Sequence, residues 1–356
     1  MHPLQKNLRP LLFIFLATLA TTLSAQTAKG DSKSNVMEKS IDAIFKDFDD
    51  IGKPGAAVAV VQKGEIVFKK GYGSANLEYD IPVSPSTIFH VASVSKQFTV
   101  FSILLLAEEG KLSLDDDIRK HIPEVPDFGK TITLRHLATH TSGMRDQWDL
   151  LSLAGWRFDD VITKEHILKL VSKQKELNFE PGEEYMYCNT GFTLLAEVVA
   201  RTSGKSFAEF TSHEIFKPLK MQYSLFYDDH EKIVKNRAYS YNRTADGFEK
   251  SVLSFANVGA TSLFTTVEDL ALWAMNFKEP KVGSPAIIEQ MNTLAILNNG
   301  QTFGGAYGQF VTPYSGLLQI QHSGGDAGYR SYLSRFPDQE FAVTVFTNRG
   351  NSNPAA

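Results

Sequence analysis

Cysteine is nearly absent from this sequence of 356 residues, and Cys188 is the only one. A single cysteine cannot form a disulfide within the chain, so the fold must be stabilised by its hydrophobic core. The core can be large, because 43% of the residues are hydrophobic and only 21% are charged. Length and composition together predict one large domain or two closely packed lobes.

An excess of positive charge is also missing, since the formal net charge is -4 at pH 7. A mildly acidic chain is a poor ligand for nucleic acids or anionic membranes, so we expect no nucleic acid partner. The sequence contains no G-x-S-x-G motif and no phosphate-binding glycine loop. These absences give no support to an α/β-hydrolase nucleophile elbow or a nucleotide site, and we expect no cofactor.

Long hydrophobic runs are missing apart from one near the N-terminus. Residues 11–23 are mostly apolar, follow Lys6 and Arg9, and precede the small residues Ser24 and Ala25. This order is typical of a secretory signal peptide, and the run is too short for a permanent membrane span. We therefore expect residues 1–25 to be removed on export to the periplasm or the medium. Residues 26–36 are polar and predict a flexible leader.

Strand patterns lie near both ends of the remaining chain, and helical patterns fill its middle. The residues predict an amphipathic helix over 37–49, a hairpin from 56–61 and 66–69, a buried helix over 98–109, and strands over 317–321, 330–336 and 341–347. The simplest fold is of the α+β class, with a mainly antiparallel sheet flanked by helices plus a helical lobe. We expect one domain over 37–356, with the sheet lobe built from about 37–90 and 250–356 and the helical lobe from about 91–249.

The last residues resemble the start of a helix. Asn353 is a capping residue, and Pro354 follows at the position that would begin the first turn. This pattern predicts a C-terminal helix that is truncated in this chain.

Ser93 and Lys96 form the first candidate catalytic motif, S-x-x-K. Residues three apart on a helix share a face, and a desolvated lysine there can accept the proton of a serine hydroxyl. The spacing alone is weak evidence, because Ser172 and Lys175 repeat it in a polar segment typical of a solvated helix face. Ser93 differs because apolar residues precede it and the predicted buried helix follows.

Two further motifs lie downstream. Tyr187 and Asn189 form the chain's single Y-x-N sequence, in which a phenol can relay a proton and an amide can orient a lysine or a substrate carbonyl. His322 is followed by Ser323 and the glycines Gly324 and Gly325, which we place just past the strand over 317–321. Glycines there let a substrate approach the backbone and leave an N–H free for an oxyanion.

In this order the three motifs resemble those of the serine penicillin-recognising hydrolases, specifically the branch of class C β-lactamases with its DD-peptidases, D-aminopeptidases and esterases. The phrases LRHLATHTSG over 134–143 and TTVEDL over 265–270 agree with it, so the resemblance covers roughly residues 40–350. It implies a β-lactamase/transpeptidase-like fold and an acyl-enzyme mechanism on a small-molecule or peptide substrate.

The resemblance also implies a role for each motif residue. Ser93 would be the acylated nucleophile, with Lys96 and Tyr187 as its proton-transfer pair. Asn189 would orient Lys96 and the substrate amide, while His322 and Gly324 would line the substrate site, with His322 beside Tyr187 or a substrate carboxylate. The backbone N–H groups of Ser93 and Gly325 would form the oxyanion hole.

His322 stands where β-lactamases of this branch usually have a lysine that holds the substrate carboxylate. Histidine occurs there in peptidase and esterase members and is at best partly charged at neutral pH. We therefore expect an exported serine hydrolase acting on D-amino-acid peptides or esters. A true β-lactamase and a non-catalytic peptidoglycan- or peptide-binding protein are the alternatives.

Two other chemistries are weaker candidates. His136 and His140 stand four apart on an expected helix, but the glutamate of a zinc-protease motif and a third ligand are missing, so we expect no metal. Cys188 with His322 could form a nucleophile pair, although a lone buried cysteine is usually inert.

Overall fold

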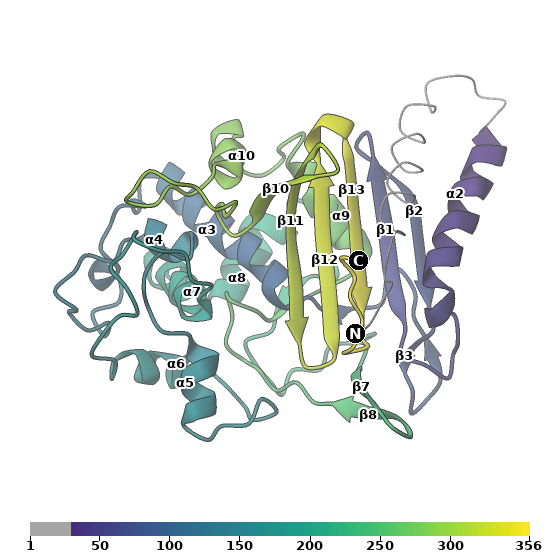
Figure 1. Cartoon of the computed structure of the whole chain (residues 1–356), viewed down its shortest axis with the longest axis horizontal. Coiled ribbons are helices and arrows are strands. Elements are labelled where there is room, and N and C mark those ends of the chain that lie inside the picture. Colours follow the sequence, from purple (N-terminus) through teal and green to yellow (C-terminus); the bar gives the residue numbers. More distant parts are fainter. Residues whose placement is uncertain (1–29) are drawn as a thin grey trace, which may run out of the picture.

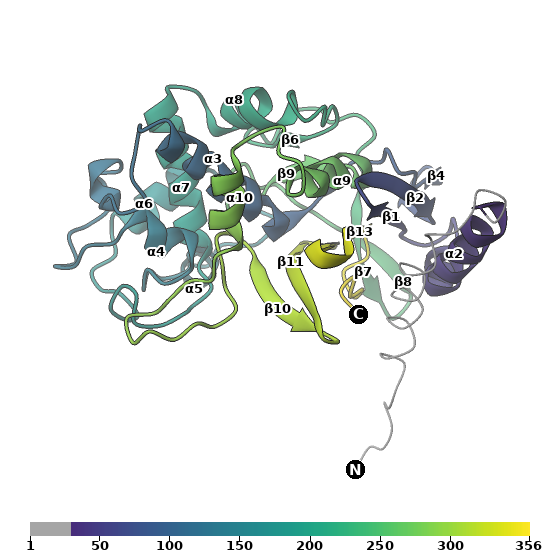
Figure 2. The same ribbon diagram turned by 90° about the horizontal axis from the view of Figure 1, so that it is seen from above.

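A sheet of six antiparallel strands forms one side of the molecule, and a helical lobe forms the other (Figures 1 and 2). The computed structural model describes residues 30–356. The α-helices are α2 (Gly30–Phe45), α3 (Ser95–Glu108), α4 (Leu134–Ala138), α5 (Gln147–Leu153), α6 (Lys164–Val171), α7 (Asn189–Ser203), α8 (Phe207–Thr211), α9 (Val267–Asn276) and α10 (Pro285–Asn292). The 3-10 turns are η1 (Lys46–Phe48), η2 (Ala92–Val94), η3 (Ile118–Lys120) and η5 (Pro337–Gln339), and η4 (Ser212–Phe216) is a π-helix.

The strands of the large sheet come from both ends of the chain, as the sequence predicted. The strands of the described residues are β1 (Ala56–Gln62), β2 (Glu65–Tyr72), β3 (Ser74–Asn76), β4 (Ile81–Pro82), β5 (Phe89–His90), β6 (Leu225–Phe226), β7 (Ser240–Thr244), β8 (Gly247–Ser251), β9 (Leu263–Thr265), β10 (Phe310–Tyr314), β11 (Leu317–Asp326), β12 (Tyr329–Phe336) and β13 (Phe341–Thr347). The large sheet has the order β10-β11-β12-β13-β1-β2. A mainly antiparallel sheet flanked by helices confirms the predicted α+β class.

β1 lies inside the sheet between β2 and β13 and is buried on both faces. Ala57 and Ala59 face the main core, whereas Val58 and Val60 face a smaller apolar cluster on the outer side. The predicted hairpin is confirmed, because β1 pairs with β2 through a turn at Lys63 and Gly64. Both turn residues have positive φ, 53° and 80°, which matches the twist of a tight hairpin.

Helix α2 covers the outer side of β1 and β2 (Figure 1). Ile41 and Phe45 are buried there, and the Phe45 ring stacks on Tyr72 with centroids 4.9 Å apart. The helix begins at Gly30, so residues 30–36 belong to its first turns and not to the predicted flexible leader. No glycine or proline occurs between Gly30 and Gly52, so no helix-breaking residue prevents the helix from reaching back to Gly30. The predicted signal peptide lies outside the described residues.

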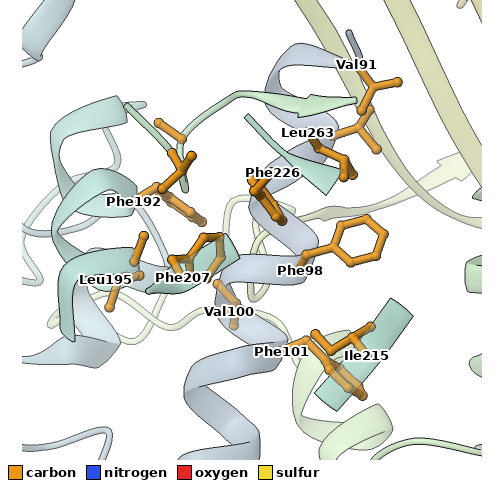
Figure 3. Close-up of a cluster of buried hydrophobic side chains, with 14 of the residues drawn as sticks. Val91, Phe98, Val100, Phe101, Phe192, Leu195, Phe207, Ile215, Phe226 and Leu263 are labelled. Atoms are coloured by element: carbon orange, nitrogen blue, oxygen red, sulfur yellow. The ribbon is translucent and has the colours of Figure 1, made fainter. Parts of the chain in front are cut away.

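The buried helix α3 runs through the middle of the helical lobe, and the sequence prediction of this helix is confirmed. Its hydrophobic residues face neighbours on every side, among them Phe98, which stacks on Trp273 at 4.2 Å, and Phe101 (Figure 3). Helix α7 packs against α3, and α9 packs against β1 and β13 on the inner face of the sheet (Figure 2). These contacts fix the start of α3 against the sheet, where the motif residues lie.

The last residues form a single turn. The Asn353 side chain accepts a hydrogen bond from the Ala355 N–H, and its carbonyl accepts one from Ala356. The hydrogen bond from the Ala355 N–H is of the kind that a capping side chain accepts, and the predicted C-terminal helix stays a prediction. Over the described residues, the structure has no helix with the length and apolarity that a membrane span requires.

Candidate active site

Ser93 lies in the 3-10 turn η2, directly before α3, and not within the α-helix itself. It is partly exposed, while both of its neighbours are buried. The preceding residue Ala92 has a φ of 47°, a left-handed conformation that is unfavourable for alanine. Such strain persists only where the surrounding structure imposes it, and here it sets the direction of the Ser93 side chain.

Lys96 is completely buried in the first turn of α3 and points at Ser93. Its Nζ lies 3.1 Å from Ser93 Oγ, 2.8 Å from Asn189 Oδ1 and 2.7 Å from the Ala260 carbonyl oxygen. Burial lowers the pKa of Lys96 to about 7, although Asp326 and Asp146 act in the opposite direction by stabilising the ammonium. Near neutral pH the amine is therefore present in both its protonated and its neutral form.

The three partners of Lys96 also define where its lone pair points when it is neutral. A neutral amine has two N–H bonds, and the amide oxygen of Asn189 and the Ala260 carbonyl can only accept hydrogen bonds. Once both N–H groups are used in this way, the lone pair faces Ser93 Oγ. The arrangement is suited to taking a proton from that hydroxyl.

Asn189 is held in this orientation by Asp146, a residue that the sequence analysis missed. The Asp146 carboxylate accepts hydrogen bonds from the Asn189 backbone N–H and from its side-chain Nδ2, the latter at 2.9 Å. Asn189 Oδ1 is thereby turned toward Lys96. Asp146 also caps α5 by accepting the Trp148 N–H, so one side chain links two helices. A single aspartate three residues past Gly143 carries no sequence signal for this role.

Tyr187 lies over Lys96 and within hydrogen-bonding reach of Ser93. The Lys96 Nζ is 4.8 Å from the centre of the Tyr187 ring. Burial raises the pKa of the phenol well above its usual value, so it remains protonated and can donate a proton. The ring stacks on His140 at 4.3 Å, and His140 Nδ1 accepts the N–H of Cys188, which fixes the loop carrying Tyr187.

His322 points into the same region from strand β11, with its ring centre 6.2 Å from that of Tyr187. Its Nδ1 donates to the Ser323 carbonyl at 2.6 Å, because a carbonyl can only accept, and its Nε2 is therefore the unprotonated nitrogen. Nε2 is buried and finds no hydrogen-bond partner among residues 30–356. Burial, reinforced by the charge of Lys96, lowers the pKa of His322 to about 3. His322 is thus a neutral hydrogen-bond acceptor.

Gly324 and Gly325 lie within β11, whereas the sequence analysis placed them just past a strand. The strand continues because its backbone pairs with β12, with Gly324 opposite Ser331 and Gly325 opposite Arg330, and this pairing needs no side chain. A Cβ at Gly324 would lie 2.3 Å from the Val91 carbonyl oxygen and 3.0 Å from the Ser93 nitrogen. Only glycine lets this strand approach the turn that carries Ser93.

The competing chemistries find no support in the geometry. Cys188 donates to the Met144 carbonyl at 3.3 Å, and burial raises the pKa of its thiol to about 12, so it is not a thiolate nucleophile. Helix α4 ends at Ala138, so His136 and His140 do not share a helix face as expected. Each instead accepts a backbone N–H with its Nδ1.

The second S-x-x-K sequence lies far from any such arrangement. Ser172 and Lys175 are exposed after the end of α6, and Ser172 Oγ donates to the Lys169 carbonyl. The two S-x-x-K sequences thus have the same spacing but different surroundings, because Lys96 is buried and Lys175 is exposed.

Comparison with known proteins identifies the group to which this fold and site belong. A family model described as Beta-lactamase matches residues 41–356, which is most of the chain. The chain therefore belongs to the β-lactamase family, as the sequence resemblance predicted, and its class is that of a serine hydrolase.

The individual relatives are only distantly similar to this chain in sequence. The chain is 26% identical to a D-aminopeptidase of Gluconobacter oxydans, over 89% of this chain and 59% of that protein. It is 27% identical to penicillin-binding protein 4* of Bacillus subtilis, over 87% of this chain and 72% of the other. The chain thus spans about three fifths of the length of that D-aminopeptidase.

Among solved structures, the chain resembles an octameric penicillin-binding protein homologue from Pyrococcus abyssi, with a TM-score of 0.78 and 28% identity over 91% of this chain and 74% of that one. It also shares its fold with a D-amino acid amidase from Ochrobactrum anthropi, with a TM-score of 0.72 and 22% identity over 86% and 91% of the two chains.

The close approach at Gly324 generates a prediction. Gly324→Ala should reduce the rate of covalent labelling of the chain by a fluorophosphonate by at least about 100-fold, because the methyl group must push β11 away from the Ser93 turn. Ser323→Ala is the matched control, since Ser323 is exposed and adjacent. Equal labelling rates for the two variants would show that the distance between strand and turn does not matter.

Proposed function

We propose that this protein is an exported serine hydrolase that forms an acyl-enzyme on Ser93 and acts on D-amino-acid peptides or amides, or on esters. The observation that carries the proposal is the environment of Lys96, which is buried, has a pKa of about 7 and has its lone-pair direction set toward Ser93 Oγ. A protein that only binds peptides would need neither a desolvated lysine nor a phenol beside the serine.

The reaction would proceed in two steps. Ser93 Oγ attacks the substrate carbonyl while its proton passes to Lys96, and the developing oxyanion is received by the backbone N–H groups of Ser93 and Gly325. The bond to the leaving group then breaks. Tyr187 donates its proton to the departing amine or alkoxide and takes a proton from Lys96 in return. Water next attacks the acyl-enzyme, gives up a proton to the same pair and releases Ser93.

The neutral state of His322 narrows the substrate class. A neutral acceptor cannot attract a carboxylate, which a positively charged residue at this position could do. Substrates that depend on a carboxylate next to the scissile bond, as β-lactams do, should therefore be poor. Amides, esters and peptides that do not need this contact remain suitable, and a substrate N–H could donate to His322 Nε2.

The relatives support the same substrate class. A D-aminopeptidase and a penicillin-binding protein are among the curated proteins that the chain resembles, and a D-amino acid amidase shares the fold. The proposed preference for D-configured substrates rests on the D-amino acid activities for which two of these proteins are named, together with the motif residues of this chain.

The proposed nucleophile can be tested against Ser172, the serine of the second S-x-x-K sequence. Ser93→Ala should abolish covalent labelling by a fluorophosphonate and change the free energy of unfolding by less than about 1 kcal/mol, because Ser93 is partly exposed. Ser172→Ala, which alters the second S-x-x-K sequence, should label like the wild type. Peptide mass mapping locates the adduct, and an adduct anywhere other than Ser93 would contradict the assignment.

The substrate class can be tested with a panel of compounds. We expect hydrolysis of D-alanine amides, D-alanyl peptides or p-nitrophenyl esters, with kcat/KM at least about 100-fold above that for nitrocefin, because His322 gives no charge to a β-lactam carboxylate. His322→Lys should raise the rate with nitrocefin. Efficient nitrocefin hydrolysis by the wild type would favour the β-lactamase alternative.

Export is proposed from the N-terminal residues, where two basic residues, an apolar run and a small-residue exit follow one another. Protein recovered from outside the cytoplasm of an expressing bacterium should begin near Gln26. Intact mass measurement checks this, and full-length protein in the cytoplasm alone would refute it.

A further inference from the structure

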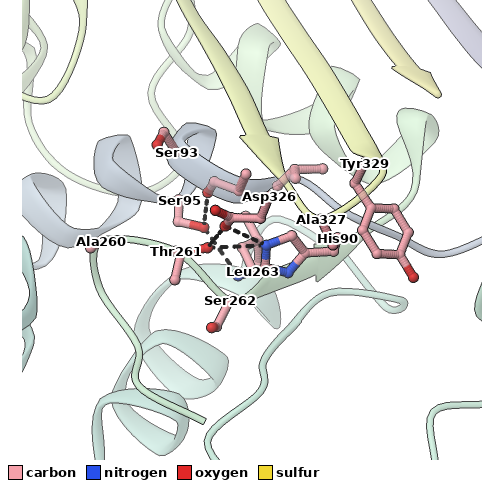
Figure 4. A network of polar contacts seen from close by, with 12 residues as sticks. His90, Ser93, Ser95, Ala260, Thr261, Ser262, Leu263, Asp326, Ala327 and Tyr329 are labelled. Carbon is pink, nitrogen blue, oxygen red and sulfur yellow. Dashed lines mark hydrogen bonds and ion pairs between the residues drawn. The ribbon is translucent and has the colours of Figure 1, made fainter. Parts of the chain in front are cut away.

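Three side chains meet beneath the candidate site and form a closed polar cluster (Figure 4). The Asp326 carboxylate lies 2.9 Å from His90 Nε2 and accepts a hydrogen bond from the Thr261 hydroxyl. Thr261 Oγ1 is also 3.0 Å from His90 Nε2. His90 and Thr261 are almost completely buried, and the Asp326 side chain is only 17% exposed.

The three residues belong to different segments, and each segment carries a part of the site. His90 ends β5, three residues before Ser93. Thr261 directly follows Ala260, whose carbonyl oxygen accepts a hydrogen bond from Lys96 Nζ. Asp326 ends β11, directly after Gly325.

We infer that Asp326, held by His90 and Thr261, is a positioning residue of the proposed active site that aligns these three segments and places a negative charge near Lys96. The inference rests on the proposed function, because it concerns the proton that Lys96 would take from Ser93. None of the three side chains is placed to touch the substrate carbonyl at Ser93, so the action is indirect.

The charges around Lys96 show why Asp326 matters. Burial disfavours the ammonium, and Asp326 is the largest influence in the other direction, followed by Asp146. The neighbouring histidines His140 and His322 are neutral because burial lowers the pKa of each. Asp326 is thus a principal negative charge that sets the protonation balance of the lysine.

The charges around Asp326 itself are few. Arg330 lies near it on β12, where the carboxylate favours the guanidinium, and Tyr187 lies near enough for the carboxylate to oppose ionisation of its phenol. The phenol is protonated throughout the neutral range, so it does not contribute a change of charge there. His90 contacts the carboxylate directly, and Tyr329 lies opposite Asp326 where β11 pairs with β12.

The test is the pH dependence of fluorophosphonate labelling at Ser93, measured on the full chain between pH 5 and pH 9. The neutral amine is the proton acceptor, so the wild-type rate should rise with pH through a midpoint near the pKa of Lys96, about 7. Removing the carboxylate in Asp326→Asn destabilises the ammonium. The midpoint should therefore move by about one pH unit to lower pH, and the ratio of the rates at pH 6 and pH 9 should rise.

Three further variants separate charge from structural damage. Asp338→Asn removes the same charge from an exposed turn at the far end of β12 and should leave the midpoint unchanged. Asp326→Glu retains the charge and should restore the wild-type midpoint. Thr261→Val should lower the labelling rate about fivefold or more at every pH while leaving the midpoint in place, because it removes a hydrogen bond but no charge.

The outcomes distinguish the two hypotheses. Wild-type protein that does not label at Ser93 contradicts the proposed function itself. Labelling of the wild type with an unmoved midpoint in Asp326→Asn overturns the role of Asp326, as does a rate in Thr261→Val equal to that of the wild type. Asp326→Ser replaces the Asn variant if the latter does not fold, since its shorter side chain cannot clash with His90.

Discussion

The removal of the Lys96 amine from water is the constraint on which the site depends. A buried ammonium is strongly disfavoured unless oxygen acceptors surround it, and the fold places a carbonyl, an amide oxygen and a hydroxyl at hydrogen-bonding distance. These three atoms come from a loop before β9, from the start of α7 and from the turn before α3. These three segments must therefore be packed together before the lysine acquires its reactivity.

The same constraint explains the surroundings of the lysine. Two histidines lie close to it, and both must be neutral, because a second positive charge in this buried region would be unfavourable. Two aspartates offset part of the desolvation without contacting the amine directly. The balance leaves Lys96 near the midpoint of its titration at physiological pH, which is where a proton acceptor is most effective.

Much of the arrangement could be predicted from the sequence, because it depends on patterns of side chains. Strand alternation near both ends of the chain predicted the sheet, and an unbroken apolar segment predicted α3. The order of the S-x-x-K, Y-x-N and H-x-G sequences predicted that their residues share one site. The structure places Ser93, Lys96, Tyr187, Asn189, His322 and Gly324 in one region.

What the sequence did not predict depends on backbone atoms or on long-range pairing. The Ala260 carbonyl has no side-chain signature, since every residue carries one. Gly324 and Gly325 are typical of the end of a strand, yet pairing with β12 extends β11 through them. Asp146 and Asp326 act through partners distant in the sequence, so nothing in their immediate neighbours indicates a role.

The pairing of β1 with β13 also has a consequence for how the chain folds. Ala56 lies opposite Thr347, so the centre of the sheet joins segments separated by almost the whole chain. Contacts between such distant segments form late, because a large loop must close before they contribute any stability. During synthesis on the ribosome, β1 must remain without its central partner until β13 has emerged. Until then one edge of β1 presents unpaired backbone N–H and C=O groups, at which another strand can add.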